Sequence, residues 1–483
     1  MPILAHRDSI DARTDSSPGS RVVIENQAPL GNNQHEHKLA GFSLLQALRE
    51  RRSRRFGLGM KMPAGPLAYE SRHKPAPLTE AEEAALVFAA GGITGPPLAD
   101  LCYAPNGGGS IMGGFIARTV ASGDSLQTVS LVVTNDEGTY LIRRPRELPD
   151  ADIPKLIELG QRGEFTELYR RSRVKIKNSR ATVSSEPLFN IKANQWSAHA
   201  GGTSYFLPIN DLTFMYVNGL LEILNEHTGA FILDDRNSFQ PAGLLKFARS
   251  RGGHLESDPA KGRVVTVRHV EQFVTEFVTA EQGMMLQNLG LMAGALGLGG
   301  FPNFANHEFG WFEALGFRME KMPANRYLGA GWFSSLMMNL LKRNPKIPYP
   351  VGLERDGEVL LKPFCPPYFS SMEEAVRAVV AIKYGTKGIF RTANPASAWT
   401  KHDEVVQSVQ AMSETTIQAT IAYCNYLWKR YGRFPVYMPP YRTVLGFQAC
   451  HLDAEFYDRF YKPETLSEAI RNDFTNQTKS GSR

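Results

Sequence analysis

The sequence predicts an α+β protein, because strand-like and helix-like segments both occur along one long chain. A β-branched run at 129–133 and a second strand-like run at 139–143 flank Asn135-Asp136-Glu137-Gly138, whose composition is typical of a hairpin turn. Apolar residues recur with a helical period from 270 to 296. The chain has 483 residues, of which 42% are hydrophobic, so it can bury a large core, and disordered and fibrous classes are excluded.

The N-terminal region predicts a tail followed by two helices. Residues 1–40 are polar and lack the apolar core of a secretory signal, so we expect a disordered tail. The first helix begins at Gly41 and carries Leu44, Leu45 and Leu48 on one face. After a loop rich in proline and glycine, Thr79 can cap a second helix, and Glu82 completes a capping box.

The rest of the chain contains a segment without a clear pattern, a long predicted helix and a C-terminal extension. Residues 145–265 are mixed in character and charged, and they give no clear pattern of elements. The periodic segment that follows ends at Gly297, a C-cap glycine with a proline beyond it. Residues 396–483 contain a helix at 404–431 and an aromatic tail, without a core of their own. They predict a helical C-terminal extension that wraps another surface, such as a second subunit.

The net charge of +6 is concentrated in one short segment. Residues 41–62 hold six basic residues against Glu50 alone. A diffuse basic face would indicate nucleic acid or a membrane surface, whereas a short basic cluster indicates a discrete anionic ligand. We therefore expect no nucleic-acid partner and no membrane partner.

Several other classes of protein are disfavoured by missing patterns. The four cysteines are far apart and form no Cys-x-x-Cys, which predicts reduced thiols in a cytoplasmic protein. No uninterrupted apolar run of about 18 residues occurs. The histidines form no His-Glu-x-x-His, so no metal site is expected. P-loop and Gly-x-Ser-x-Gly signatures are also missing, which disfavours P-loop NTPases and α/β-hydrolases.

The basic segment at 51–55 is the first candidate site. Guanidinium groups bind phosphate oxygens through paired N–H donors, and a serine hydroxyl adds a short donor. Arg51, Arg52 and Ser53 are therefore candidates for holding a phosphate monoester. The alternative interpretation is a solvated basic turn or a targeting patch.

Two further segments are candidates on weaker grounds. The small residues at 121–124 would let a flat ring approach the backbone, with hydroxyl, amide and carboxylate groups at its edge. The glycines at 297–300 leave backbone N–H groups open toward an acceptor nitrogen. The alternatives are an ordinary turn for the first segment and an ordinary helix end for the second.

Taken in order, these segments resemble the FMN-dependent nitroreductase family, and most closely its azoline-dehydrogenase-like branch. Four motifs carry the resemblance: Arg-Arg-Ser-x-Arg at 51–55, a helix followed by Gly-Ile-Thr-Gly at 77–95, Ala-Ser-Gly-Asp-Ser-Leu at 121–126, and a Gln-Asn helix ending in glycines at 287–299. The match covers 41–135 and 268–300, is thin from 301 to 390, and is absent in 145–265 and after 395.

The resemblance implies a nitroreductase-like fold, with a central, mainly antiparallel sheet flanked by helices, a long insertion and a helical C-terminal extension. The FMN-binding domain would cover 41–395, with the 145–265 insertion as a lid that sets substrate choice, and 396–483 would wrap a second subunit. Members of this family are typically homodimers with FMN at the interface.

The resemblance also assigns cofactor-binding residues in three groups. The FMN phosphate would be held by Arg51, Arg52 and Ser53, and Arg55 would reach the pyrimidine edge of the flavin. The isoalloxazine would lie along Ser122, Gly123 and Asp124. Backbone N–H groups would point toward N5 from Gly299, Gly300 and Phe301. Family members usually carry glycine or asparagine where Asp124 stands. An aspartate there would accept from the flavin N3–H but oppose a negatively charged reduced ring.

The implied function is an FMN-dependent oxidoreductase that moves hydride or electrons between NAD(P)H and a small flat organic substrate through flavin N5. Two alternatives stay open. One is a biosynthetic FMN-dependent dehydrogenase or oxidase, of azoline or other type, that passes electrons to O₂. The other is an inactive flavin-fold scaffold or partner protein. The Lys-Tyr pair of azoline dehydrogenases has no convincing match, because Lys246 lacks the tyrosine and Lys383-Tyr384 follows the helix instead of preceding it.

Overall fold

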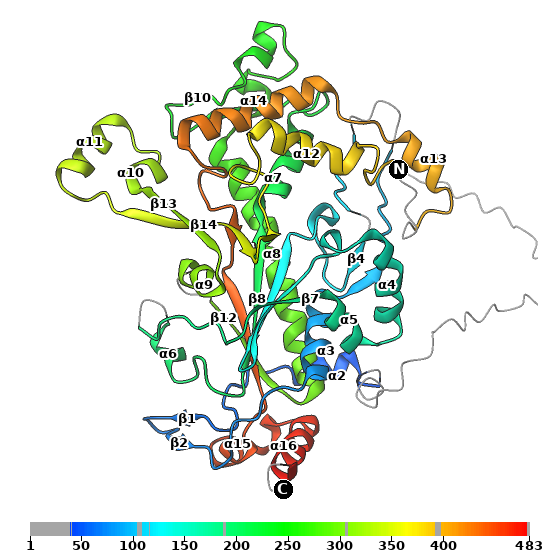
Figure 1. Cartoon of the computed structure of the whole chain (residues 1–483), viewed down its shortest axis with the longest axis vertical. Helices are drawn as coiled ribbons and strands as arrows, with labels where there is room; N and C mark the ends of the chain where they lie inside the picture. Colours follow the sequence, from blue (N-terminus) through cyan, green and yellow to red (C-terminus); the bar gives the residue numbers. More distant parts are fainter. Residues whose placement is uncertain are drawn as a thin grey trace, which may run out of the picture.

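The computed structural model describes residue 39 and residues 41–103, 109–114, 116–186, 190–304, 308–391 and 398–480. The tail predicted at 1–40 therefore lies outside the described residues, apart from Leu39. Figure 1 shows a tall molecule with a sheet and a long helix at its centre, helices across the top and a lateral arm.

A seven-stranded sheet, counted over the described residues, forms the centre in the order β12-β17-β8-β5-β6-β7, with β16 paired to β8. Its strands are β5 (Val129–Asn135), β6 (Gly138–Ile142), β7 (Arg173–Lys177), β8 (Ser204–Asp211), β12 (Gly299–Phe304), β16 (Tyr441–Arg442) and β17 (Leu445–Cys450). Each of these pairings is antiparallel. The predicted α+β class with an antiparallel central sheet is confirmed.

Side chains of the central strands alternate between two cores. Leu131 and Val133 of β5 point into a core shared with α3 (Glu80–Gly91) and α8 (Val267–Leu296), whereas Val132 points into a core on the other face of the sheet. This second core contains residues of α9 (Glu308–Leu315). The period of two residues is the reason why both faces of the strand are buried.

The two predicted helices of the central layer form as expected. The Thr79 hydroxyl accepts from the Glu82 backbone, and the Glu82 carboxylate accepts from the Thr79 backbone, so the capping box is confirmed. The long helix α8 begins after Thr266 and ends at Gly297, whose φ of 82° suits glycine.

A second helical layer lies at the top of the molecule (Figure 1). It consists of α7 (Leu212–Ile223), α12 (Met372–Tyr384) and α14 (Glu414–Tyr431), which share one apolar core with the first turns of α8. The helix predicted at 404–431 is interrupted: α13 (His402–Ser408) ends six residues before α14 begins.

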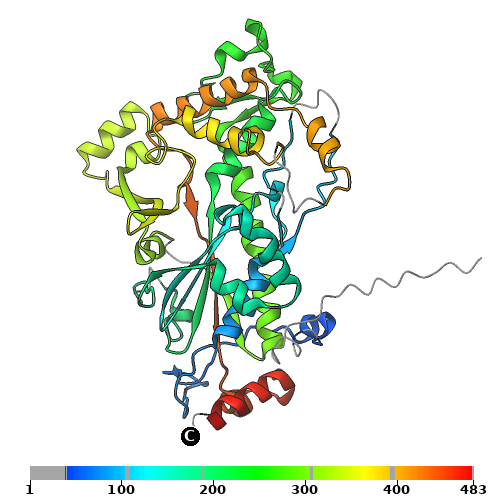
Figure 2. The same ribbon diagram turned by 45° about the vertical axis from the view of Figure 1, so that its right-hand side comes forward.

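The lateral arm is a three-stranded antiparallel sheet with a helical tip. Strand β13 (Arg318–Pro323) pairs with β14 (Lys346–Arg355), and β14 pairs with β15 (Glu358–Leu361). The connection from β13 to β14 contains α10 (Ala324–Tyr327) and α11 (Trp332–Leu340). Figures 1 and 2 both show this tip standing away from the body.

Smaller elements complete the described part of the chain. They are α2 (Leu44–Glu50), β1 (Lys61–Met62), β2 (Tyr69–Glu70), β3 (Ile93–Gly95), β4 (Ala117–Arg118), α4 (Ile153–Gln161), α5 (Phe165–Ser172), α6 (Lys192–Gln195), β9 (Phe231–Asp234), β10 (Gln240–Pro241), β11 (Val264–Thr266), α15 (Ala454–Phe460) and α16 (Glu468–Ser480). None of the helices in the described ranges combines the length and the apolar character needed to span a bilayer.

Two regional predictions need correction. Residues 145–265 do not form a separate lid, because β8 within them pairs with both β5 and β17 inside the central sheet. Residues 396–483 are not a purely helical extension, because β17 lies between β12 and β8. Both strands pair with segments far away in the sequence, so neither has a neighbouring hairpin signal. Whether the C-terminal region wraps a second subunit stays a prediction.

Candidate functional site

A cavity of about 370 Å³ opens between the end of α2, one face of α8 and the strands β12 and β17. Its lining residues are Arg51, Arg52, Ser53, Gly283, Leu286, Gln287, Gly290, Gly300, Pro302, Asn303, Phe304, Leu445 and Phe447. This volume lies within the range of roughly 300–1,000 Å³ that is typical of small-molecule sites. The cavity has a basic end, an apolar wall and several glycines.

The basic end is formed by the three residues that follow α2. Arg51, Arg52 and Ser53 are all exposed. Within the described ranges, the Arg52 guanidinium donates to two backbone carbonyls, those of Arg49 at 3.4 Å and Arg51 at 3.1 Å. Over the described residues, no carboxylate lies within 4.0 Å of the Arg51 or Arg52 guanidinium, as it would in an ion pair. Their positive charge is therefore available to an anionic ligand.

The wall from α8 is one continuous helical face. Gly283, Leu286, Gln287 and Gly290 follow the i, i+3, i+4, i+7 spacing that places residues on one side of a helix. A Cβ atom at Gly283 would meet no atom within 4 Å, so that position is open to the solvent. Leu286 is buried and gives the wall its apolar character, whereas Gln287 is exposed.

Strand β12 forms the opposite wall, and its two glycines have different surroundings. A Cβ atom at Gly299 would lie 2.3 Å from Leu452 Cδ2 and 2.9 Å from the Arg54 carbonyl oxygen. Packing behind the strand therefore requires this glycine. Gly300 lines the cavity, and a Cβ atom there would lie 2.4 Å from Phe447 Cζ. Of the predicted group at 299–301, only Gly300 reaches the cavity.

Arg55 and Phe301 are brought together outside the cavity lining. The Arg55 guanidinium carbon lies 4.3 Å from the Phe301 ring centroid and 5.1 Å from that of Trp196. Its Nη2 donates to Asn194 Oδ1 at 2.7 Å and to Ser197 Oγ at 3.2 Å. Burial lowers the pKa of Arg55. The Arg55 guanidinium is thus occupied by protein contacts. Its predicted role at a flavin edge stays a prediction.

The loop with Ser122, Gly123 and Asp124 lies on a different face of α8. The Ser122 hydroxyl donates to Glu281 Oε2 at 3.2 Å, and a Cβ atom at Gly123 would lie 3.1 Å from Phe277. Since each residue of an α-helix turns by about 100°, Glu281 faces roughly the opposite direction from the cavity-lining positions. Within a single chain, this loop therefore does not reach the cavity.

Asp124 belongs to a buried group of titratable side chains that the sequence analysis did not assemble. Its Oδ2 accepts from Asn218 Nδ2 at 3.3 Å, and Asn218 Oδ1 accepts from Lys383 Nζ at 2.5 Å. Burial raises the pKa of Asp124 to about 6 and lowers the pKa of Lys383 to about 8. A sequence signal existed, because Lys383 follows Val376 and Val379 on the buried face of α12.

Tyr384 extends this group toward the neighbouring loop. Its hydroxyl accepts from the Ser110 backbone N–H at 2.8 Å, and Lys383 Nζ donates to the Ser110 carbonyl oxygen. The Lys383-Tyr384 pair thus comes within two hydrogen bonds of the 122–124 loop, although the pair follows α8 in the sequence.

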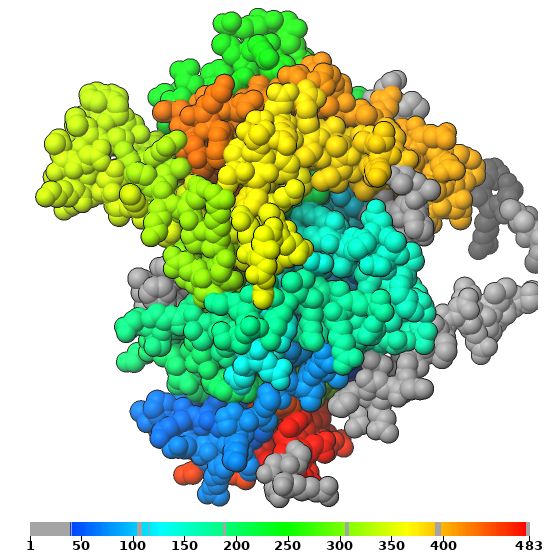
Figure 3. Space-filling model, in the orientation of Figure 1, coloured from blue at the N-terminus to red at the C-terminus, as the bar shows by residue number. Residues whose placement is uncertain are grey.

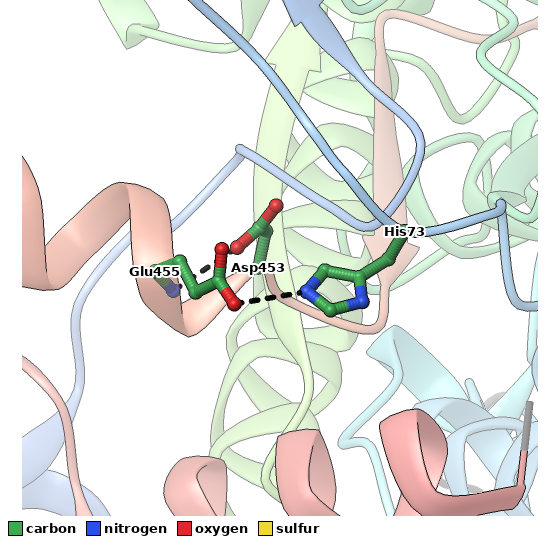
Figure 4. Close-up of side chains that lie close together, drawn as sticks. All are labelled: His73, Asp453 and Glu455. Atoms are coloured by element: carbon green, nitrogen blue, oxygen red, sulfur yellow. Dashed lines mark hydrogen bonds and ion pairs between the residues drawn. The ribbon is translucent and has the colours of Figure 1, made fainter. Parts of the chain in front are cut away.

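The structure also gathers His73, Asp453 and Glu455, which carry metal-ligand atom types (Figure 4). Protein contacts account for their arrangement. His73 Nε2 lies 3.3 Å from Glu455 Oε1, and Tyr69 donates to the other oxygen of Glu455 at 3.3 Å. Asp453 Oδ1 accepts from the first backbone N–H groups of α15, at 3.0 Å from Glu455. These are the contacts of a helix cap and of hydrogen-bonded side chains.

A second such group joins three distant elements. His451, at the end of β17, lies with Nδ1 2.8 Å from Asp473 of α16 and Nε2 3.5 Å from Glu82 of α3. Burial opposes the charged form, but hydrogen bonds to Asp473 and Glu82 raise the pKa of His451 to about 9. We assign it a structural role as an enclosed cation.

Comparisons with known proteins leave the family open. No protein-family model and no curated protein matches the chain. Among solved structures it aligns with a candidate nitroreductase from Ralstonia eutropha JMP134, at 11% sequence identity, over 60% of this chain and 80% of that chain, with a TM-score of 0.28. A TM-score of 0.28 does not show that the two proteins share a fold. The nitroreductase resemblance rests on the four sequence motifs.

Proposed function

We propose that the protein is an FMN-dependent oxidoreductase of nitroreductase type, which acts on a small flat organic substrate with NAD(P)H as its co-substrate. The observation that carries the proposal is the composition of the cavity. Two motifs that lie far apart in the sequence, at 51–53 and at 287–300, line the same cavity. The composition of each motif alone does not predict that the two motifs share a cavity.

The residues present fit such a cofactor. Arg51, Arg52 and Ser53 offer guanidinium and hydroxyl donors without competing carboxylates, as a phosphate monoester requires. Leu286 and Phe447 offer an apolar wall that suits a flat ring and excludes water from it. FMN, when bound, supplies hydride transfer at its N5. The chain's own residues bind and orient, and no protein nucleophile is needed.

A homodimer accounts for the separation between the cavity and the 122–124 loop. Phe273, Phe277 and Met284 form an exposed apolar stripe along α8, and Leu44 of the adjacent α2 is also 67% exposed. A two-fold axis that passes near Ala280 would cover this stripe with a second copy of itself. In the homodimer that we propose, the 122–124 loop of one copy lies beside the cavity of the other.

A second candidate function is favoured by the position of Lys383. A biosynthetic FMN-dependent dehydrogenase or oxidase needs groups that move protons on its substrate, and Lys383 and Tyr384 lie close to the 122–124 loop. In that case electrons would pass from the substrate to O₂, and NAD(P)H would not be the reductant. Slow NAD(P)H oxidation with a nitroarene or quinone, together with tightly bound flavin, would favour this candidate.

The deciding experiment is a visible absorption spectrum of the purified protein, followed by chromatography of the ligand that heat releases. A yellow protein that releases FMN supports the proposal, and reduction by NADH or NADPH then separates the two candidates. FAD in place of FMN would remove the single-phosphate interpretation of Arg51 to Ser53. A colourless protein that takes up no added FMN would instead favour a scaffold or partner protein.

A further inference from the structure

The two helices in the tip of the lateral arm have different surroundings, because α10 is held to the body through the Tyr327 carbonyl, which accepts from Arg236 and Arg433, whereas α11 lies farther out (Figure 1). Helix α11 contains no buried residue. Figure 3 shows the arm as a lobe that projects from the body, and Figures 1 and 2 show it on the side opposite to α2. The body of the protein therefore does not explain why this helix is apolar.

Apolar side chains cover about half of the circumference of α11. At 100° per residue, six apolar side chains fall within one half of the helix, and the other half carries Ser334, Ser335, Met338 and Asn339. Trp332 is 80% exposed and Phe333 is 60% exposed. The other exposed apolar residues of the tip are Leu328, Leu336, Met337, Leu340 and Leu341. So much exposed apolar surface in one place marks an interaction site.

The same segment is strongly basic. Residues 321–353 contain no aspartate or glutamate, and they contain five basic residues, which are Lys321, Arg326, Lys342, Arg343 and Lys346. All five are exposed. Over the described ranges, none of them lies within ion-pair distance of a carboxylate. The β13–β14 pairing places Pro323 opposite Lys346, so basic residues from both strands gather at the base of the tip.

This combination identifies the chemistry of the partner. An apolar arc with Trp and Phe, next to uncompensated lysines and arginines, is the pattern of a helix that lies in the interface of an anionic bilayer. A second copy of the chain is a poorer occupant, because a two-fold pairing of the tips would set the basic residues of one copy against those of the other. The exposed stripe of α8 is already the contact of the proposed homodimer.

We propose that the α10–α11 tip docks the protein peripherally on an anionic lipid surface. The apolar arc of α11 enters the headgroup boundary, and the exposed basic residues beside it, foremost Lys342 and Arg343, contact the lipid phosphates. The prediction of no membrane partner rests on the charge balance along the chain, in which the basic residues of the arm are offset by acidic residues elsewhere. The tip is independent of the basic segment at 41–62 and of the cavity, so this proposal stands or falls apart from the flavin.

The test is co-sedimentation of the full chain with vesicles of phosphatidylcholine mixed with phosphatidylglycerol, compared with vesicles of pure phosphatidylcholine. We expect binding to the mixed vesicles that weakens as salt increases. Trp332→Ser with Phe333→Ser should abolish it. Lys342→Gln with Arg343→Gln should weaken it by roughly tenfold or more, since each basic residue near an anionic surface contributes a several-fold factor.

Phe239→Ser is the matched control, because Phe239 is also 60% exposed but lies outside the arm. It should bind like the unchanged protein. Equal binding to both kinds of vesicle, or full binding by the Trp332/Phe333 variant, would overturn the proposal. A third result would also overturn the proposal. If the unchanged protein does not bind vesicles, and light scattering shows a dimer that the arm variants break, the tip is assigned to a second copy.

Discussion

Two basic regions of this molecule differ in the surface that surrounds them. Arg51 and Arg52 stand at one end of a cavity of about 370 Å³, beside the Ser53 hydroxyl. Lys342 and Arg343 follow an exposed apolar helix at the tip of a projecting arm. A concave surface with a few convergent donors selects a small anion, whereas a convex apolar surface with spread charge suits an extended one. The shape around a charge, and not its amount, separates the two expected ligands.

The largest expected effect tests the cavity half of this comparison. Arg51→Ala combined with Ser53→Ala removes two charge-assisted contacts to a phosphate, each worth about 1.5–3 kcal/mol. We expect FMN affinity to fall by roughly 1,000-fold, which corresponds to about 4 kcal/mol. Fluorescence titration of the apoprotein with FMN measures it.

Arg49→Ala is the control for this change, because Arg49 lies in the last turn of α2 but does not line the cavity. It should retain most of the affinity. Stoichiometric flavin in the double variant would show that the phosphate is bound elsewhere.

An enclosed cation provides the contrast to both open regions. His451 lies between Asp473 and Glu82, and its pKa is raised to about 9. The unfolded value is about 6.5, so the charged histidine stabilises the fold fully below about pH 6.5, and this contribution is lost as pH rises through 9. His451→Gln should cost about 3 kcal/mol near neutral pH, because two carboxylates lose their partner.

Urea unfolding at several pH values measures this prediction. The unchanged protein should lose stability between pH 6.5 and 9.5, and the variant should lose less over the same interval. Equal losses in both proteins would mean that His451 is not the charged group. A surface histidine variant such as His269→Gln serves as the control, since His269 is exposed.

A smaller effect tests whether the cavity is completed by a second copy. Phe277→Arg places a charge in the exposed stripe of α8. We expect a shift from dimer to monomer in light scattering and a flavin affinity about tenfold weaker, because the 122–124 loop would no longer reach the cavity. Phe239→Arg is the control. A monomeric unchanged protein, or a variant with an intact dimer, would contradict the proposed interface.

Local signals in the sequence predicted a good part of the fold. The Thr79–Glu82 capping box and the periodic segment that became α8 both depend on residues within a few positions of each other. Strand β17 could not be found in this way, because it pairs with β12 and β8 from distant parts of the chain. Its short run of six residues also contains Gly446 and Gln448, which weaken any strand pattern.

The candidate site shows the same division. Arg51 to Ser53 could be predicted because their donors are adjacent in the sequence, and the structure places them with Gln287. The engagement of Arg55 by Asn194 could not, because α6 lies in a segment without a recognisable pattern. The basic character of the arm was hidden for a related reason, since its five charges are spread over 26 positions and gathered only by the β13–β14 pairing.

The smallest expected effect tests whether the two basic regions are independent. Lys342→Gln combined with Arg343→Gln removes charge from the arm but touches no residue of the cavity. FMN affinity should therefore change by no more than about twofold, because charges separated by more than a Debye length of about 8 Å are largely screened at physiological salt. Titration with FMN and vesicle co-sedimentation of the same preparation measure both properties.

The reciprocal variant completes this test. Arg51→Ala with Ser53→Ala should lose FMN while its binding to anionic vesicles stays unchanged. If the arm variant lost flavin, or the cavity variant lost the vesicles, the two regions would act on one anion, and the distinction between a concave and a convex basic surface would fail for this molecule. If each variant loses only its own ligand, surface shape is the physical basis of the separation.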